Sequence, residues 1–568
     1  LRKTGYPILP VNITIFNFKL GTTIKNINAD ISEPIIINLT EPLRYNPLIT
    51  TDNVINKKQE AAEIPNIYPN EWFTIQTGGG LIRENRTSFF ILRIYPVRYK
   101  PDTHQLLYTP RFTINITFQE PEKPVKGANK TYDLLVISPA IFISTLKPLI
   151  QHKEEIGIKT KNITLQRIYK EIDQGRDNAE KIKYYIKHAI EEWGIRYVLL
   201  VGGRRYQSYS WHLPVRYSHV VPYDIQEYNE ISFLSDLYYA DIYNYEGTFS
   251  SWDTNMNGVF SEWTNNTRDE IDLYPDVYLG RLACNNKNDL RIIVNKIINY
   301  EKQKANDSWF KRMVMIAGDS YDDESHYIEG ELATDEAYKY MSSFTPVRVW
   351  ASEQDINRDT VKAAVDPGCG FIYICGHGNP ANWNTHYPPN GTIWCTGFGN
   401  KDIRSLRNND KLPIIIVGGC HNAQFDTTMI NLIVGILKHR LKYFSTKQPY
   451  GEFWHREWVP RCWAWQFMIN SKGGGIATIA NTGLGTHGSD DVDHNRVPDY
   501  LEVLDGWLEI NFFRLYGEGN MDILGQIHGD TLSSYLNIFL GNNDPMDVKM
   551  VQQWVLLGDP SLKIGGYS

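Results

Sequence analysis

The sequence is poor in several features that would each mark a particular class of protein. It has six cysteines in 568 residues and no C-x-x-C pair, which argues against a disulfide scaffold and a zinc knuckle. No apolar run approaches the roughly 18 residues of a membrane-spanning helix. The 58 Lys and Arg against 65 Asp and Glu leave a net charge of -7 and no basic stripe. We therefore expect no membrane span and no nucleic-acid partner.

What the chain does contain is typical of a soluble globular protein. Apolar residues make up 42% and charged residues 22% of the sequence. At roughly 150 residues per domain, the length predicts three or four domains. The chain begins at Leu1 without an apolar leader, so we expect a processed or excised product. Numerous N-x-S/T sequons are compatible with export.

The N-terminal part of the chain has the period-two alternation of β-strands. Residues 11–16 and 112–118 alternate apolar and polar side chains, and proline and glycine separate such runs. No convincing amphipathic helix interrupts them. We predict an all-β, sandwich-like domain over residues 1–126.

A segment with the composition of an exposed linker follows this domain. Residues 121–130 combine proline, glycine and lysine. Its lysines, Lys123, Lys126 and Lys130, are expected to be accessible to a protease that cuts after basic residues.

From Tyr132 the pattern becomes that of β-α-β units. Residues 134–137 and 197–201 are short, fully apolar strands, and residues 182–193 between them carry one apolar helical face. The pattern restarts near residue 311. This predicts an α/β fold with mostly parallel sheets in two subdomains, over residues 127–300 and 301–568.

Three apolar strands of the second subdomain end in residues that can carry out chemistry: Asp319, His377 and Cys420. Ligands of open parallel sheets bind at the carboxyl ends of the strands. A thiol beside an imidazole is a nucleophile with its base, and a carboxylate can orient the imidazole. The amides of Gly378 and Cys420 could stabilise an oxyanion. A lone cysteine or histidine is more often structural, but the pair with flanking glycines favours catalysis.

Two segments carry a family resemblance. Residues 375–383 resemble the histidine segment of the gingipains, and residues 419–425 resemble their nucleophile segment. Weaker resemblances to gingipain segments lie at residues 132–137, 272–281 and 557–562, and residues 1–120 resemble the propeptide. The 43 positions from His377 to Cys420 exceed the family spacing and suggest an insertion around residues 388–398.

The resemblance implies two subdomains of the caspase-like fold and a secreted or cell-surface cysteine endopeptidase that is made as a zymogen. Cys420 would attack the peptide bond, His377 would move the proton, and Asp319 would orient His377, although arginine gingipains have Glu there. The protein's own N-terminal prodomain would act as an inhibitor by covering the cleft until the linker lysines are cut. Its other partners would be protein or peptide substrates.

Cleavage after Arg or Lys requires an acid in the primary substrate pocket. By position, Glu331 is the nearest counterpart of the gingipain pocket acid, and Glu329 is a close rival. Both could instead be ordinary acids at a helix N-terminus. The resemblance also assigns Trp383 to substrate binding, together with His487, which stands near the place of a gingipain tryptophan.

Two loops resemble calcium-binding loops, and the family implies structural calcium. Residues 253–258 place oxygen side chains at positions one, three and five, with glycine at six. The first set of candidate ligands is Asp253, Asn255, Asn257 and Glu262. The second set is Asp491, Asp493, Asn495, Asp499 and Glu502, although Arg496 replaces the usual glycine. Ordinary Asn- and Asp-rich turns are the alternative.

Two other functions remain open from the sequence. A sortase-like transpeptidase on the same fold would pass the thioester to an amine instead of water. A catalytically dead, calcium-dependent surface module would keep an inert Cys420.

Overall fold

The computed structural model describes most of the chain. The described residues are 1–46, 66–122, 131–221, 230–264, 266–303, 308–321, 327–389, 391–445, 453–519 and 521–567. The proposed processing sites Lys123, Lys126 and Lys130 lie outside them.

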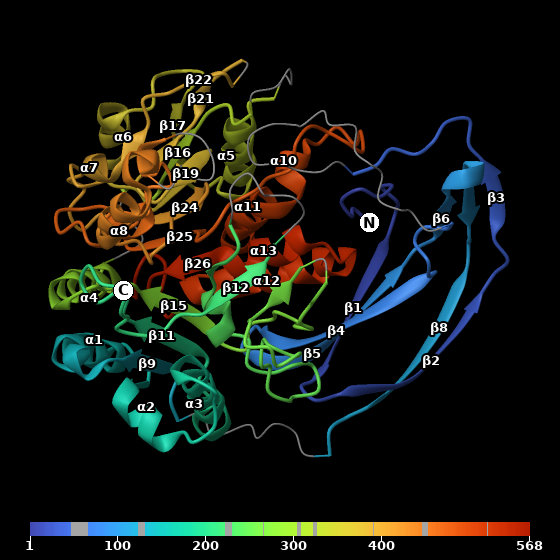
Figure 1. Cartoon of the computed structure of the whole chain (residues 1–568), viewed down its shortest axis with the longest axis horizontal. Helices are drawn as coiled ribbons and strands as arrows, with labels where there is room; N and C mark the ends of the chain where they lie inside the picture. The colour runs from blue at the N-terminus through green and yellow to red at the C-terminus, as the bar shows by residue number, and fades with distance from the viewer. Residues whose placement is uncertain are drawn as a thin grey trace.

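Residues 1–122 form antiparallel β-structure, drawn in blue in Figure 1. The strands are β1 (Asn12–Lys19), β2 (Thr23–Ile31), β3 (Ile35–Asn38), β4 (Phe73–Ile82), β5 (Asn85–Ile94), β6 (Val97–Lys100), β7 (Gln105–Tyr108) and β8 (Phe112–Gln119). They pair as three small sheets, β1-β5-β4, β2-β8 and β3-β7-β6. In the described part of this range the helical content is one 3₁₀ turn, Pro101–Thr103, as the alternation predicts.

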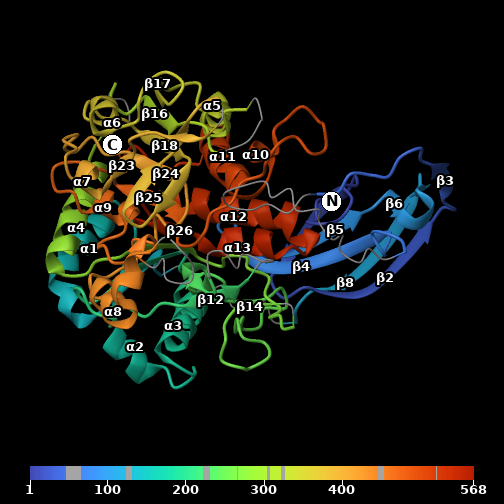
Figure 2. The same cartoon turned by 45° about the horizontal axis from the view of Figure 1, so that its top comes forward.

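The β-structure shares its inner edge with the rest of the molecule. Leu81, Phe89 and Ile91 of β4 and β5 are buried in the same hydrophobic core as the α/β strands. A separate, small cluster forms around Leu9, Tyr68 and Tyr99. The strands β2 and β3, which extend away from the α/β part in Figures 1 and 2, are largely exposed.

Residues from 131 onward build one ten-stranded sheet in the order β10-β9-β11-β15-β26-β25-β24-β18-β16-β17. Its strands are β9 (Leu134–Ser138), β10 (Thr160–Thr164), β11 (Tyr197–Val201), β15 (Tyr278–Leu282), β16 (Arg312–Ala317), β17 (Thr345–Trp350), β18 (Phe371–Cys375), β24 (Ile414–Gly418), β25 (Ala477–Asn481) and β26 (Trp554–Leu557). The predicted, mostly parallel α/β fold is confirmed, since among the described strands of this ten-stranded sheet only the β25–β26 pair is antiparallel. The two predicted halves meet at β26, which pairs with β15 on one side and β25 on the other.

Helices cover this sheet. The longer ones are α1 (Ile143–Glu155), α3 (Asn178–Trp193), α4 (Lys287–Glu301), α5 (Glu329–Tyr340), α8 (Ile430–His439), α11 (Leu504–Gly517), α12 (Leu524–Phe539) and α13 (Pro545–Gln553). The predicted helix α3 is capped by Asp177 and ends at Gly194, whose φ of 69° is left-handed. Helix α12 contacts both β15 and β4, so it lies between the sheet and the β-structure (Figure 2). Across the described ranges, every helix is too short or too polar to cross a bilayer.

Candidate active site

The register of three neighbouring strands brings the predicted catalytic residues to one edge of the sheet. In the pairing of β16, β18 and β24, Ala317 lies opposite Cys375 and Cys375 opposite Gly418. Asp319, His377 and Cys420 each follow this aligned row by two residues. Because the strands are parallel and adjacent, the three residues emerge together, as the sequence predicted.

His377 and Cys420 line one open cavity of about 890 Å³. Cys420 is half-buried, whereas the other five cysteines of the chain are buried. The Cys420 thiol donates to the carbonyl of Gly485 at 3.6 Å. The remaining walls come from Tyr217, Glu230–Leu234, Gly378, Asn379, Asn382, Asn384, Trp394, His421, Gln424, Asp426, Trp454–Glu457, Thr482 and Leu484. The thiol and the imidazole therefore face a cavity large enough for several substrate side chains.

A backbone carbonyl fixes the orientation of the His377 ring. His377 begins β19 (His377–Asn379), and its Nε2 donates to the carbonyl of Ser320 at 2.6 Å. This contact places the proton on Nε2 and makes Nδ1 the nitrogen that can accept a proton. The ring also packs beside Trp394 and His386, with centroids 5.2 Å away in each case.

Asp319 and Glu329 both belong to or contact the peptide segment that orients His377. Asp319 is buried, and its backbone pairs with His386 in both directions at 3.0 and 3.2 Å. The hydrogen bond described for His377 goes to Ser320, the residue after Asp319. The Ser320 amide in turn donates to Glu329 at 3.1 Å. Glu329, predicted as a substrate-binding acid, is thus a buried support for the Ser320 peptide and does not line the large cavity.

Gly378 and Asn422 join the histidine segment to the nucleophile loop. Asn422 donates through Nδ2 to the carbonyls of Asn379 at 2.9 Å and Asn382 at 3.2 Å. A side chain on Gly378 would place Cβ 2.1 Å from Asn422 Oδ1 and 2.7 Å from the Cys420 carbonyl. The absence of a side chain at Gly378 is therefore what allows this backbone to pack closely against Asn422 and the Cys420 carbonyl.

Three further residues predicted to bind substrate, Glu331, Trp383 and His487, do not line the large cavity. Glu331 is buried and accepts hydrogen bonds from the amide and hydroxyl of Ser352, at 2.9 and 2.7 Å. Burial raises the pKa of its carboxyl group. Trp383 is 1% exposed and donates to the Gly418 carbonyl at 3.3 Å, beneath the β19–β20 hairpin (β20 is Asn382–Asn384). His487 is buried against Tyr500, with ring centroids 4.3 Å apart.

The cavity contains residues that the sequence reasoning missed. Trp394 lies on β22 (Ile393–Trp394), which pairs with β21 (His386–Tyr387) in the segment predicted as an insertion. The long spacing from His377 to Cys420 was the available signal for this wall. Residues 230–234 approach from the other half of the sheet, and nothing local in the sequence indicates that. The carboxylates of the cavity are Glu230, Asp426 and Glu457.

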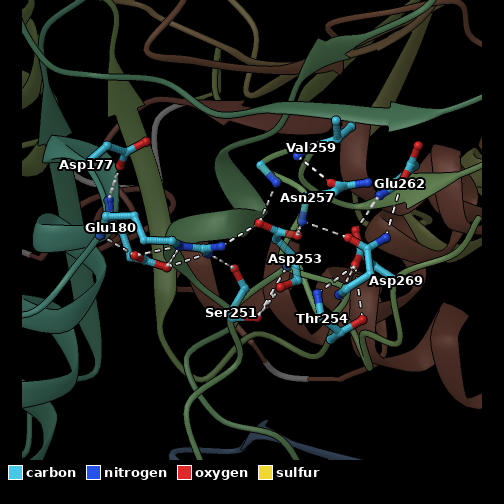
Figure 3. A network of polar contacts seen from close by, with 12 residues as sticks. Asp177, Glu180, Ser251, Asp253, Thr254, Asn257, Val259, Glu262 and Asp269 are labelled. Carbon is cyan, nitrogen blue, oxygen red and sulfur yellow. Dashed lines mark hydrogen bonds and ion pairs between the residues drawn. The ribbon is translucent and has the colours of Figure 1, made fainter.

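In the first predicted calcium loop, hydrogen bonds connect the predicted ligands to one another (Figure 3). Asn257 Nδ2 donates to Glu262 at 2.7 Å, and the Asn257 amide donates to Asp253 at 3.0 Å. Asn255 also contacts Glu262, at 3.3 Å. The other oxygen of Asp253 is shared by the Gly258 amide and the Arg176 guanidinium. Arg176 thus pairs with Asp253, one of the four predicted ligands, while Asn255 and Asn257 both donate to Glu262.

The second predicted loop holds a cation from the protein itself. Carboxylate oxygens of Asp491, Asp493 and Asp499 lie within 4.8 Å of one another. Arg2 from the N-terminal segment pairs with Asp493, with Asp499 at 2.7 Å and with Glu502 at 3.0 Å. Asn495 donates to Glu502 at 2.9 Å. Calcium at this loop would have to compete with Arg2, so this donor set fits it less well.

Comparison with known proteins identifies a family model and several relatives that match this chain. A family model described as "Peptidase family C25" matches residues 127–565. Gingipain R2 of Porphyromonas gingivalis is 26% identical over 165 residues, which cover 27% of this chain and 20% of that protein. Lys-gingipain of the same species is 21% identical over 227 residues, 38% of this chain and 12% of that protein. The aligned part thus spans a fifth or less of these relatives.

Solved structures also match. The complex of the Porphyromonas gingivalis RgpB pro- and mature domains covers 76% of this chain and 79% of that chain, at 18% identity and a TM-score of 0.49. The Arg-specific cysteine proteinase gingipain R (RgpB) covers 78% of this chain and 80% of that chain, at 17% identity and the same TM-score.

Proposed function

The chain belongs to peptidase family C25, and we propose that it is a cysteine endopeptidase with Cys420 as nucleophile and His377 as base. The observation that carries this proposal is that both residues line one open cavity at the carboxyl ends of adjacent parallel strands. Five other cysteines are buried, so Cys420 is the thiol that a substrate can reach.

The proposed reaction follows from these positions. His377 takes the thiol proton, and the Cys420 sulfur attacks the substrate carbonyl to form a thioester. The amides of Gly378 and Cys420 stabilise the oxyanion, and His377 protonates the leaving amine. Water then hydrolyses the thioester and regenerates the thiol. The Ser320 carbonyl keeps the ring oriented throughout, with Asp319 and Glu329 supporting that segment.

We propose cleavage after Arg or Lys. The acids that would bind the basic side chain differ from those predicted from the sequence. Asp426 and Glu457 line the cavity, whereas Glu331 and Glu329 are buried elsewhere. Asp426 accepts from the Tyr217 hydroxyl at 2.8 Å, and Glu457 accepts from Gln424 at 3.1 Å. Glu230 is already paired with Lys549 at 2.9 Å, which leaves it less suited to a substrate cation.

We further propose a secreted zymogen with structural calcium at residues 253–262. Residues 1–126 precede the segment that matches the family model, which supports a separate prodomain there. That this prodomain covers the cleft stays a prediction. In the described ranges, the cavity walls come from residue 217 onward, and residues 1–122 contribute none.

The test uses a labelled Lys- or Arg-chloromethylketone. Wild-type protein and the buried-thiol control Cys284→Ala should be labelled and should process their own linker. Cys420→Ala should lose both, with kcat reduced on the order of 10⁶-fold. Labelling or processing that persists in Cys420→Ala would contradict the proposal.

A further inference from the structure

A second cluster of a thiol, an imidazole and a carboxylate lies beneath the catalytic edge. Cys375 ends β18, two residues before His377. His487 stands two residues after Gly485, whose carbonyl accepts from Cys420. Glu509 comes from α11, and all three side chains are buried.

The three donor atoms form a nearly regular triangle. Cys375 Sγ is 3.8 Å from His487 Nε2 and 3.6 Å from Glu509 Oε2, and Nε2 is 3.5 Å from Oε2. Zinc binds sulfur at about 2.3 Å, nitrogen at about 2.0–2.1 Å and oxygen at about 2.0–2.2 Å, mostly in tetrahedral geometry. Donors on such a tetrahedron are separated by about 3.3–3.6 Å. The observed separations agree with these edges to within a few tenths of an ångström.

A network of hydrogen bonds explains these separations less well. A charged imidazole that donates to a carboxylate does so at about 2.7–2.9 Å, much shorter than the 3.5 Å between His487 and Glu509. Glu509 Oε2 accepts from the Tyr373 hydroxyl at 2.7 Å, but the buried Oε1 has no hydrogen-bond partner in the part of the chain that the structure describes. Among the described residues, no lysine or arginine forms an ion pair with Glu509. The carboxylate is thus buried with less compensation than such a group requires.

We propose that Cys375, His487 and Glu509 bind a zinc ion. On binding, the Cys375 thiol loses its proton to solvent, and the thiolate and carboxylate together balance the two positive charges. The Tyr500 hydroxyl lies 3.3 Å from Cys375 Sγ, and a cavity of about 20 Å³ lined by His487 and Tyr500 has room for one water. Either oxygen could complete the coordination.

The zinc ion would connect the elements that carry the catalytic groups. Cys375 precedes His377 on the same chain segment, and His487 belongs to the loop that contacts Cys420. Glu509 would connect both to α11, and it also packs against the end of β24, where a side chain on Gly418 would meet its carboxylate at 2.7–2.8 Å. The small cavity beside His487 is also lined by His377 and Cys420. The ion is therefore expected to hold the floor of the active site in place.

The test measures metal in a full-length protein that carries Cys420→Ala, so that the nucleophile contributes neither a ligand nor self-cleavage. Zinc content by mass spectrometry, after exchange against excess calcium, should be one per chain. Adding Cys375→Ala or Glu509→Gln should reduce it to about a tenth or less. Cys369→Ala, which removes another buried thiol, should keep it. Cobalt substitution should give a thiolate charge-transfer band that requires Cys375.

Two outcomes would overturn the proposal. One is a Cys420→Ala protein that binds no zinc. The other is zinc and the cobalt band retained after Cys375→Ala. Glu509→Gln is the milder change if Cys375→Ala misfolds, and circular dichroism identifies that case. Because the parent variant lacks the proposed nucleophile, these results do not depend on whether the protein is a peptidase.

Discussion

At the scale of single residues, Gly378 has no room for a side chain. Gly378→Ala would place Cβ 2.1 Å from Asn422 Oδ1, so the hairpin must shift away from Cys420. Because the amide then no longer points at the oxyanion, we expect kcat to fall about 10²–10³-fold with a smaller change in KM. Steady-state kinetics on a peptide substrate would measure this.

Asn422→Ala provides the matched comparison for Gly378. It removes the atom that Cβ would meet, but it also removes two hydrogen bonds to the hairpin. If the collision causes the loss, the double variant should be less impaired than the product of the single effects. Strictly multiplicative effects would show that the two sites act independently.

Asp530 should make stability depend on pH. Burial raises the pKa of this carboxyl group from 3.8 to about 6 in the folded protein. Its protonated form therefore contributes stability that is fully present below pH 3.8 and is lost as pH rises through about 6. Asp530→Asn keeps an acceptor for the Tyr278 hydroxyl, which lies 3.0 Å from Asp530. Relative to wild type, it should gain up to about 3 kcal/mol between about pH 4 and pH 7.

Urea unfolding at the two pH values measures that gain. Asp102→Asn removes the same charge at an exposed position, and its difference from wild type should stay nearly constant. An Asp530→Asn gain that is equal at both pH values would rule out a raised pKa as its cause.

At this scale the sequence predicted strand ends better than substrate contacts. Asp319, His377 and Cys420 could be placed because each follows an apolar strand, which is a local signal. Glu331 could not, because its direction depends on how α5 packs against β16 and β18. The Gly330 amide donates to the Gly318 carbonyl at 3.1 Å, which brings the first turn of α5 into the interior.

At the scale of elements, the loop of residues 253–262 gives a test of calcium. Glu262 accepts hydrogen bonds from both Asn255 and Asn257. Its carboxylate is therefore the negative charge that we expect to coordinate a bound cation. Added calcium should raise the Tm of the wild-type protein, and Glu262→Gln should remove most of that rise. Differential scanning calorimetry with calcium and with a chelator measures both.

Glu270 is the control for this loop because it carries the same charge nearby. Its side chain is 80% exposed, and Glu270→Gln should leave the calcium-dependent shift intact. A shift that survives Glu262→Gln would place the calcium elsewhere, with the loop of residues 491–502 as the next candidate.

At the scale of the whole molecule, the sequence marked several strands of the large sheet but not how the two halves join. Apolar runs marked β11, β18 and β24 because strands buried on both faces need no polar alternation. The last strand, β26, is inserted between β15 and β25 and runs antiparallel to β25. Such a pairing depends on long-range packing, which the local composition of Trp554–Leu557 does not specify.

The contact between the β-structure and the α/β part is also long-range. Arg93 of β5 is 1% exposed, and it donates to the Asn537 carbonyl at 2.9 Å and to Gln76 at 2.6 Å. Close packing continues at Gly78, where a side chain would place Cβ 2.3 Å from the Tyr274 ring. With Leu81, Phe89 and Ile91 in the shared core, this contact resembles a domain interior more than a transient interface.

We therefore expect residues 1–122 to stay bound after the linker is cut. In the Cys420→Ala protein treated with a Lys-specific protease, the two fragments should elute together in size-exclusion chromatography. Arg93→Ala leaves the buried Asn537 carbonyl without this donor at a cost of about 1–3 kcal/mol, which weakens the association about 5- to 150-fold. Arg98→Ala is the control, because Arg98 donates to Pro69 at 2.7 Å within the β-structure and should leave the complex intact. If the fragments of the Cys420→Ala protein with Arg93 intact separate without denaturant, the linker and not this buried contact holds the two parts together.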